Sequence, residues 1–245
     1  MKGYVLITGA SSGIGRAIAV RLAGEWPLIL CGRDRARLEE TRALCGEAAR
    51  TELFALDFAD IEQVAPQMQT FLQERDLPVA GFVHSAGMAP LAPLRITSLT
   101  AMQEIMHVNF FAAAEILRIL TTKRVNHQHL QAVVFISSVL AQQGAKGQSI
   151  YCASKGALDA FCRAMAEELA PSVRVNVIRP GAIETPIASQ VLAGGEEVRA
   201  KLAQGYMLGY GHPEDIANMV HYLLSAEAAW ITGQCINVDG GRTAH

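Results

Sequence analysis

A tyrosine and a lysine four residues apart could perform acid–base chemistry in this 245-residue chain. Tyr151 and Lys155 open a strongly helical segment, and a spacing of four residues places two side chains on one face of a helix. An ammonium group beside a phenol favours the phenolate, so we expect Lys155 to lower the pKa of Tyr151 from about 10. Tyr151 would then serve as an acid or a base near neutral pH.

Two further polar residues strengthen this pair, which alone is a weak signal because such pairs arise by chance on many helices. Ser138 follows a predicted strand, and Asn109 lies in an earlier predicted helix. Open α/β sheets bind their ligands in a crevice at the carboxyl ends of the strands. The sequence therefore predicts a site at that edge of the sheet.

A glycine-rich turn follows the first predicted strand and opens a helix. Its backbone N–H groups could approach a pyrophosphate closely, and the helix dipole would favour the negative charge. The spacing is G-x-x-x-G-x-G rather than the commoner G-x-G-x-x-G, and a tight turn with helix-packing glycines is the alternative interpretation. The residues predicted to contact a dinucleotide here are Gly9, Ser11, Ser12, Gly13, Ile14 and Gly15.

The end of the second predicted strand indicates which nicotinamide cofactor would bind. An acidic residue at this position would bind both ribose hydroxyls of NAD, but here Gly32 is followed by Arg33. A guanidinium suits a 2′-phosphate, so NADP(H) is preferred and NAD(H) stays open. If the register slips by one residue, Asp34 could take the ribose role, and Arg33 could be an ordinary solvated charge.

Short β-branched or apolar runs alternate with longer segments of helical periodicity, such as Ile14, Ile18 and Leu22. This order predicts an α/β fold with a single domain over residues 1–245, a doubly wound parallel sheet of about seven strands with helices on both faces. The glycine-rich segment 181–211 is interpreted as a mobile substrate loop, with a plain surface insertion as the alternative. The predicted strands are Tyr4–Thr8, Leu28–Cys31, Glu52–Leu56, Ala80–His84, Ala132–Ser137, Arg174–Ile178 and Cys235–Val238.

Composition excludes several classes of function. The net charge of −2 gives no sign of a nucleic acid or a membrane surface as partner, and no apolar run approaches the ~20 residues that span a bilayer. Five scattered cysteines without a C-x-x-C pair fit a reducing, cytoplasmic location. His127 and His129 have no nearby third ligand in the sequence, so no metal site is predicted.

These motifs together resemble those of the short-chain dehydrogenase/reductase family, and the match covers nearly the whole chain. The resemblance implies a Rossmann-type sheet and an oxidoreductase. The matching pieces are Thr8–Gly15, Asp57, His84-Ser85-Ala86-Gly87, Asn109, Ser138, Tyr151-x-x-x-Lys155, Asn176-x-x-x-Pro180-Gly181, Thr185 and Thr232-Gly233.

The resemblance also implies a role for each catalytic residue. Tyr151 would be the acid/base, and Ser138 would orient and polarise the substrate oxygen. Lys155 would hold the nicotinamide ribose and tune Tyr151, while Asn109 would support a water that links Lys155 to solvent. Besides the glycine loop and Arg33, the implied cofactor contacts are Asp57, Ala86, Gly87, Tyr151, Lys155, Pro180, Gly181 and Thr185.

One departure from the family pattern concerns the pair His84-Ser85, where the family usually has Asn-Asn. We interpret His84 as a structural histidine at a strand end rather than a catalytic one, so the change bears on cofactor affinity and not on the chemistry.

The predicted function is transfer of a hydride between NADP(H) and a small-molecule carbonyl or secondary alcohol. An NAD-dependent alcohol dehydrogenase and a non-catalytic dinucleotide-sensing protein are the alternatives. An acyl-carrier thioester stays open as substrate, with Lys123 and Arg124 as contacts for an acidic carrier.

The predicted helix from about Ser149 to Ala170 carries two apolar stripes, although a surface helix normally needs only one apolar face. The second face therefore predicts a homodimer or a homotetramer, with cover from the same chain as the alternative. One stripe is Ala153, Ala157, Ala160 and Ala164, and the other is Leu158, Phe161, Met165 and Leu169.

Overall fold

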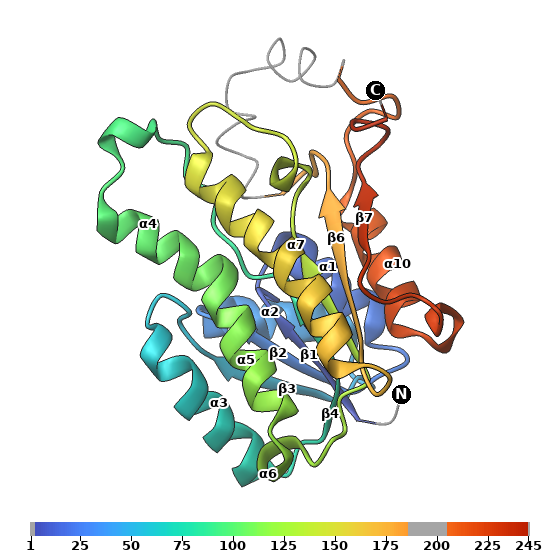
Figure 1. The fold of residues 1–245 in the computed structure, drawn as a ribbon. Helices are drawn as coiled ribbons and strands as arrows, with labels where there is room; N and C mark the ends of the chain where they lie inside the picture. Colours follow the sequence, from blue (N-terminus) through green and yellow to red (C-terminus); the bar gives the residue numbers. More distant parts are fainter. Residues whose placement is uncertain (1–2, 186–204, 245) are drawn as a thin grey trace.

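Seven parallel strands form the centre of the computed structural model, which describes residues 3–185 and 205–244 (Figure 1). Their order across the sheet is β3-β2-β1-β4-β5-β6-β7. The order reverses between β1 and β4, and this switch point opens the crevice in which such sheets bind ligands. The strands are β1 Tyr4–Thr8, β2 Leu28–Gly32, β3 Thr51–Ala55, β4 Val79–His84, β5 Ala132–Ile136, β6 Arg174–Pro180 and β7 Cys235–Val238.

Every predicted strand is present, with differences only at the ends. β2 and β6 extend to Gly32 and Pro180, beyond the predicted bounds, whereas β5 stops at Ile136, before the predicted Ser137. These ends differ because ladder pairing with neighbouring strands, not apolar content, decides where a strand stops: Gly32 pairs with Ala55 and Pro180 with Val238.

Two layers of helices cover the two faces of the sheet (Figure 1). Side chains of β1 alternate between them: Leu6 belongs to the core under α3, α5 and α7, and Ile7 to the core under α1, α2 and α10. The first layer comprises α3 Ile61–Arg75, α5 Ala112–Thr121 and α7 Ser149–Leu169, with α4 Leu99–Met106 and the short α6 Lys123–Asn126 beside them. The second comprises α1 Gly13–Leu22, α2 Arg35–Cys45 and α10 Pro213–Leu224.

A π-helical segment, His107–Phe111, joins α4 to α5. Extra residues of this kind interrupt α-helices mostly at functional sites. Short 3₁₀ turns follow the ends of β4 and β5, at Leu94–Ile96 and Val139–Ala141. Both therefore lie toward the carboxyl edge of the sheet, which is the edge that the glycine-rich turn also occupies.

The segment 181–211, which the sequence predicts to be a mobile substrate loop, is described only in part. The structure describes residues 181–185 and 205–211, while 186–204 lie outside the described residues.

No helix in the described parts of the chain combines the length and the apolar character that crossing a membrane requires.

Candidate active site

The glycine-rich turn needs its glycines for both conformation and space. Gly9 and Gly13 have φ values of +68° and +51°, which side chains rarely adopt. A Cβ on Gly9 would lie 2.7 Å from the Ala86 nitrogen, and one on Gly15 would collide with the Gly9 carbonyl. The backbone of the turn is thereby exposed at the start of α1, where the first N–H groups of a helix have no intrahelical partner. This arrangement fits a pyrophosphate.

The other residues predicted in the turn are accessible, and an arginine of α1 holds the turn in place. Ser11, Ser12 and Ile14 are half-buried around the turn. Arg16, by contrast, is held by the protein itself: its guanidinium donates to the Ser11 carbonyl at 2.7 Å and to Glu40 at 2.8 Å. Arg16 therefore fixes the turn against α2.

The residues after β2 are placed by a helix cap. Asp34 precedes α2, and its carboxylate accepts a hydrogen bond from the Arg37 N–H at 3.2 Å. Gly32 lies next to the Ser11 side chain, with a Cβ there 3.6 Å from Ser11 Oγ. Arg33 is exposed and forms no hydrogen bond or ion pair with the described residues. A cation is thus left at the end of β2, beside the glycine-rich turn.

His84 at the end of β4 has the structural role that the sequence predicts. Its Nδ1 lies 3.0 Å from Thr8 Oγ1, which accepts hydrogen bonds from the Ser85 and Ala86 N–H groups at 3.2 Å each. Burial, reinforced by the charge of Lys155, lowers the pKa of His84 to about 3. The imidazole is therefore neutral, and it joins the loop after β4 to the end of β1.

Tyr151, Ser138 and Lys155 meet at the carboxyl ends of β4 and β5. The Ser138 side chain lies near the Tyr151 hydroxyl, where it favours the charged form of the tyrosine, and it accepts a hydrogen bond from the Leu140 N–H at 3.1 Å. Lys155 is buried; its Nζ lies 5.9 Å from the centroid of the Tyr151 ring and donates to the Ile136 carbonyl at 2.8 Å. The three side chains thus form one cluster.

The pKa of Tyr151 contradicts the expectation drawn from the Tyr–Lys spacing. Burial raises the pKa of Tyr151 above its usual value of 10, and the nearby Ser138 side chain only partly opposes this rise. Burial also lowers the pKa of Lys155 to about 8, against the attraction of Asp159. The spacing predicts the lysine's proximity but not the loss of solvent, which disfavours the charged form of both groups.

Gly87 and Asn109 complete the surroundings of Lys155. A Cβ on Gly87 would lie 3.3 Å from Lys155 Nζ and 3.5 Å from Asn109 Oδ1. Asn109 is fully buried; its Oδ1 accepts from the Met88 N–H at 2.8 Å, and its Nδ2 donates to the Met88 carbonyl at 3.0 Å and to Ser154 Oγ at 2.9 Å. The side chain of Asn109 is therefore occupied in holding the Gly87–Met88 backbone beside Lys155.

Sequence reasoning missed the two serines that support this cluster. Ser154 pairs with Asn109, and Ser137 Oγ donates to the Lys155 carbonyl at 3.0 Å. Each serine directly precedes a residue that was identified, and adjacency to Lys155 and Ser138 was the available signal.

The remaining predicted cofactor contacts lie along the same edge. Asp57 is exposed after β3, and its carboxylate accepts from the Ala59 N–H at 3.0 Å. Pro180 ends β6, and the Gly181 N–H donates to the Val238 carbonyl at 3.0 Å. Thr185 Oγ1 lies 3.4 Å from the Ile183 carbonyl, at the end of the described segment.

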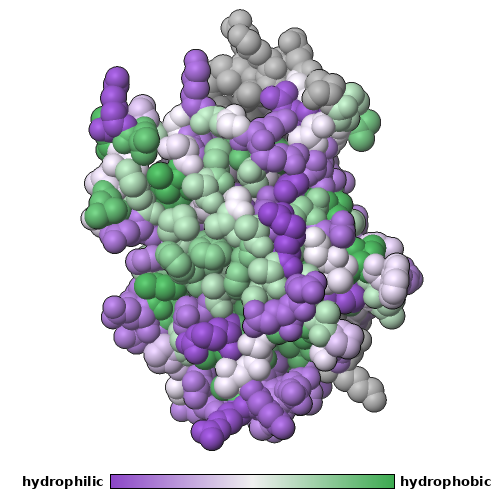
Figure 2. Space-filling view, in the orientation of Figure 1, coloured by the Kyte–Doolittle hydropathy of each residue, from purple (hydrophilic) through white to green (hydrophobic). Residues whose placement is uncertain are grey.

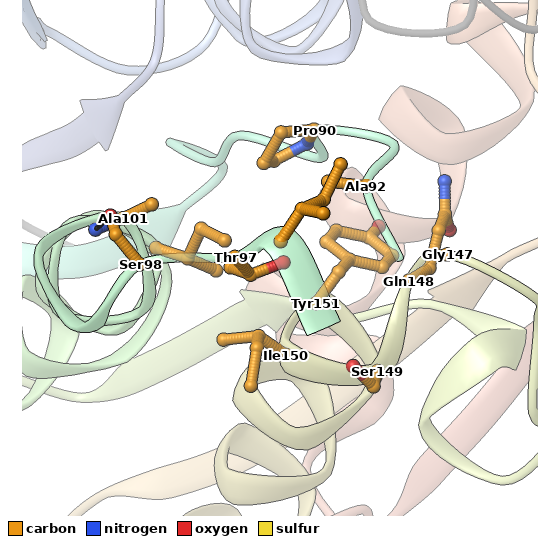
Figure 3. A pocket seen from close by; sticks show the side chains of 12 residues that line it. Pro90, Ala92, Thr97, Ser98, Ala101, Gly147, Gln148, Ser149, Ile150 and Tyr151 are labelled. Carbon is orange, nitrogen blue, oxygen red and sulfur yellow. Dashed lines mark hydrogen bonds between the residues drawn. The ribbon is translucent and has the colours of Figure 1, made fainter. Parts of the chain in front are cut away.

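A cavity of about 160 Å³ opens beside Tyr151, between the loop after β4 and the start of α7. Figure 3 shows the Tyr151 ring at its wall, with Ala92 and Ile150 nearby. Among the described residues that line it, none is charged. Apart from Tyr151, no residue of this lining was predicted from the sequence; the lining residues are Pro90, Ala92, Ile96, Thr97, Ser98, Ala101, Ile105, Gly147, Gln148, Ser149, Ile150 and Tyr151.

Comparisons with known proteins identify the family. Residues 9–243 match a family profile described as enoyl-(acyl carrier protein) reductase. A 3-oxoacyl-[acyl-carrier-protein] reductase of Aquifex aeolicus is 33% identical over 96% of this chain and 95% of its own. The chain belongs to the short-chain dehydrogenase/reductase family. It is an oxidoreductase that acts on alcohol or carbonyl groups with a nicotinamide cofactor.

Other members of the family show how widely its substrates and cofactors vary. Cyclopentanol dehydrogenase of Comamonas testosteroni is 29% identical over 98% of this chain and 97% of its own. An actinorhodin polyketide ketoreductase solved with NADPH superposes with a TM-score of 0.91, at 26% identity over 99% of this chain and 98% of that one. A 4-hydroxyisoleucine dehydrogenase solved with NADH also reaches 0.91, at 25% identity over the full length of both chains.

Proposed function

We propose that this short-chain dehydrogenase/reductase prefers NADP(H) and interconverts a carbonyl group and a secondary alcohol on a compact, uncharged small molecule. The catalytic part of the proposal rests on the contact of Tyr151 with Ser138 beside Lys155. The preference for NADP(H) rests on Arg33.

The residues at the sheet edge fit a dinucleotide. The exposed backbone of the glycine-rich turn would hold the pyrophosphate, and Arg33 would bind the 2′-phosphate. Asp34 supports this register, because its carboxylate already caps α2. On the nicotinamide side, Gly87 leaves room beside Lys155 Nζ, which would bind the ribose. The other residues that would contact the cofactor are Asp57, Ala86, Tyr151, Pro180, Gly181 and Thr185.

Tyr151 would transfer the proton. When bound, the nicotinamide supplies or accepts the hydride. In the reductive direction, Ser138 and Tyr151 donate hydrogen bonds to the carbonyl oxygen, and Tyr151 gives its proton to that oxygen as the alcohol forms. Because burial raises its pKa, Tyr151 holds this proton at neutral pH. Lys155 assists with its positive charge, and Asn109 positions the backbone beside it.

The cavity beside Tyr151 supports the choice of substrate class. Its described lining combines the apolar Ile96, Ile105 and Ile150 with the uncharged polar groups of Thr97 and Gln148. An anionic substrate would find no cation among these residues, and a buried unpaired charge is costly. A compact ketone with at most a few hydroxyl groups fits best.

A carrier-bound substrate receives less support. The two cations considered as its contacts, Lys123 and Arg124, lie on α6. This helix packs at the start of β4, where Asn126 bonds to both backbone groups of Val79. The start of a strand is the edge opposite to Tyr151 in a parallel sheet, so these cations would not meet a carrier at the site.

The experiment that tests the proposal is a pair of fluorescence titrations with NADPH and NADH, followed by a screen of ketones and aldehydes for NADPH oxidation. We expect tighter binding of NADPH, and turnover of neutral ketones in preference to their carboxylated analogues. Tighter binding of NADH would contradict the cofactor preference, and faster turnover of the carboxylated set would contradict the substrate class.

We further propose that the enzyme assembles as a homodimer or homotetramer through α7. The alanine stripe of this helix faces solvent at Ala153, Ala160 and Ala164. Figure 2 shows that weakly hydrophobic residues gather on the face formed by α4, α5 and α7. The scattered cysteines favour a reducing compartment, and we place the enzyme in the cytoplasm.

A further inference from the structure

Two cysteines far apart in the sequence meet between α7 and the last strand. Cys162 is buried on α7, and Cys235 is the half-buried first residue of β7. Cys162 Sγ lies 3.3 Å from the Val175 carbonyl and 4.0 Å from the carbonyl of Gln234, the residue that precedes Cys235. Cys162 lies eleven residues after Tyr151, about 16 Å along the helix at 1.5 Å per residue, so this pair is outside the catalytic cluster.

Charged groups surround the two sulfur atoms. Arg163 Nη1 lies 3.7 Å from Cys235 Sγ, and Arg163 is exposed. Cys235 Sγ also lies 3.9 Å from the carbonyl of Asp159, whose carboxylate is buried in an ion pair with Arg179 at 2.8 Å. Cys235 therefore lies half-buried beside cations, while Cys162 is fully buried.

These surroundings separate the acidities of the two thiols. The neighbouring thiol of Cys162, aided by Arg179 and Arg163, lowers the pKa of Cys235 to about 7 against the opposing effects of burial and Asp159. The neighbouring Cys235, with burial, raises the pKa of Cys162. At neutral pH Cys235 is thus the nucleophile, and Cys162 holds its proton.

We propose that Cys235 and Cys162 form a thiol–disulfide exchange pair, in which Cys235 attacks a small-molecule disulfide and Cys162 then closes an internal disulfide. Neither step uses the oxidoreductase site, and the pair would function whatever the substrate of that site is.

The two steps balance as an exchange of one disulfide for another. The Cys235 thiolate attacks one sulfur of the small disulfide, forms a mixed disulfide and releases one thiolate. The negative charge beside Cys162 is then gone, which removes the main cause of its raised pKa. Cys162 gives its proton to the first released thiolate and attacks Cys235 Sγ, the sulfur–sulfur bond of the mixed disulfide breaks, and a second small thiolate leaves. Counted from the Cys235 thiolate, the protein loses two electrons and one proton, and the small disulfide is reduced to one thiol and one thiolate, which takes a proton from the solvent.

The internal disulfide would connect α7, which carries Tyr151 and Lys155, to β7. The far end of β7 meets the end of β6, where the Gly181 N–H bonds to the Val238 carbonyl. The oxidised form would therefore tie together two elements that border the active site, and an added reductant would release them.

The test treats the reduced full-length protein with oxidised glutathione at pH 7, blocks the remaining thiols and maps tryptic peptides by mass spectrometry. We expect a disulfide between peptides 156–163 and 202–242, formed through glutathionylated Cys235. At equal disulfide concentration, Cys235 should react about tenfold faster than Cys45, because a larger fraction of it is thiolate. Burial raises the pKa of Cys45, which is also half-buried and serves as the internal reference.

Three variants separate the roles. Cys162→Ser should stop at the mixed disulfide on Cys235, Cys235→Ser should abolish the fast reaction, and Cys45→Ser should leave the internal disulfide unchanged. The proposal is overturned if the wild-type protein accumulates the mixed disulfide without closing it, or if Cys45 reacts as fast as Cys235. Both of these outcomes are read from wild-type protein, so they hold even where a serine variant folds poorly.

Discussion

At the scale of single residues, burial has more influence on Tyr151 than its neighbouring cation. Lys155 Nζ lies 5.9 Å from the centre of the tyrosine ring, yet the pKa of Tyr151 is raised and not lowered. The residue is therefore set to give a proton at neutral pH, and the reductive direction is the one that this protonation state serves directly.

The hydroxyl of Tyr151 should be necessary for turnover but not for cofactor binding. We expect Tyr151→Phe to reduce kcat by about 10²–10⁴-fold, the usual contribution of general acid–base catalysis, while the Kd for NADPH stays nearly unchanged. Steady-state kinetics and fluorescence titration measure the two quantities. Tyr222→Phe, on the surface of α10, is the control. A Tyr151→Phe enzyme with more than about a tenth of wild-type kcat would contradict the role.

The pH dependence of reduction should follow Lys155 rather than Tyr151. The pKa of Lys155 is lowered to about 8 and that of Tyr151 is raised above 10. As the pH rises through 8, Lys155 loses the positive charge that assists proton transfer, while Tyr151 keeps its proton. We expect kcat/KM for NADPH, which reports the free enzyme, to be level below this pH and to fall above it. If the pH profile of kcat/KM has its only inflection near pH 10, Lys155 keeps its positive charge as the pH rises through 8, and the prediction is wrong.

Arg33 should discriminate between the two cofactors. Arg33→Ala removes a charge-assisted contact to the 2′-phosphate, so we expect it to weaken NADPH binding by about 1.5–3 kcal/mol and to leave NADH unchanged. Isothermal titration with both cofactors measures the difference. Arg35→Ala removes a nearby exposed cation that pairs with Glu39 instead, and it should affect neither cofactor. Equal losses for NADPH and NADH in Arg33→Ala would assign Arg33 to a general structural role.

At the scale of elements, two buried asparagines hold opposite ends of the sheet in the same way. Asn109 in the π-helical segment bonds to both backbone groups of Met88, and Asn126 at the end of α6 bonds to both backbone groups of Val79. Only Asn109 lies at the edge that carries Lys155. Comparing variants of the two asparagines therefore separates the effect of the lost hydrogen bonds on stability from their effect on catalysis.

We expect Asn109→Ala and Asn126→Ala each to lower the free energy of unfolding by about 1–3 kcal/mol or more, because each leaves buried backbone groups unpaired. Only Asn109→Ala should also reduce kcat, since it frees the Gly87–Met88 backbone beside Lys155. Urea unfolding and steady-state kinetics give the two readouts. Similar kcat values in the two variants would show that Asn109 has no positioning role.

At the scale of the whole molecule, α7 divides its apolar residues between two environments. Phe161, Met165 and Leu169 pack partly buried against the core of the sheet, whereas three residues of the alanine stripe face solvent. Small side chains permit close approach of a second helix, and a self-complementary patch favours two-fold symmetry. The stripe is thus the surface that we assign to subunit contact.

Ala160→Arg should disrupt the assembly, because it places a long charged side chain in the centre of the alanine stripe. We expect sedimentation equilibrium to give two or four times 26.3 kDa for the wild type and a mass near 26.3 kDa for the variant. Glu168→Arg changes an exposed charge on the same helix and should keep the wild-type mass. A monomeric wild type would refute the proposed assembly.

The sequence by itself determined the strands and the local arrangement of several predicted site residues. Apolar runs of strand length predict all seven strands, and the spacing of Tyr151 and Lys155 places them on one helix face. The glycine pattern predicts a turn in which Gly9 has no space for a side chain. These features are local, because they depend on residues that lie within a few positions of each other.

Only the tertiary structure decided the features that depend on what surrounds a residue. Burial reverses the expected shift of the Tyr151 pKa, and the position of α6 removes Lys123 and Arg124 from the site. The cavity beside Tyr151 and the contact of Cys162 with the start of β7 join segments that are distant in the chain. Desolvation and long-range contact arise from packing, and the periodicity of one segment carries no information on which other segment will cover it.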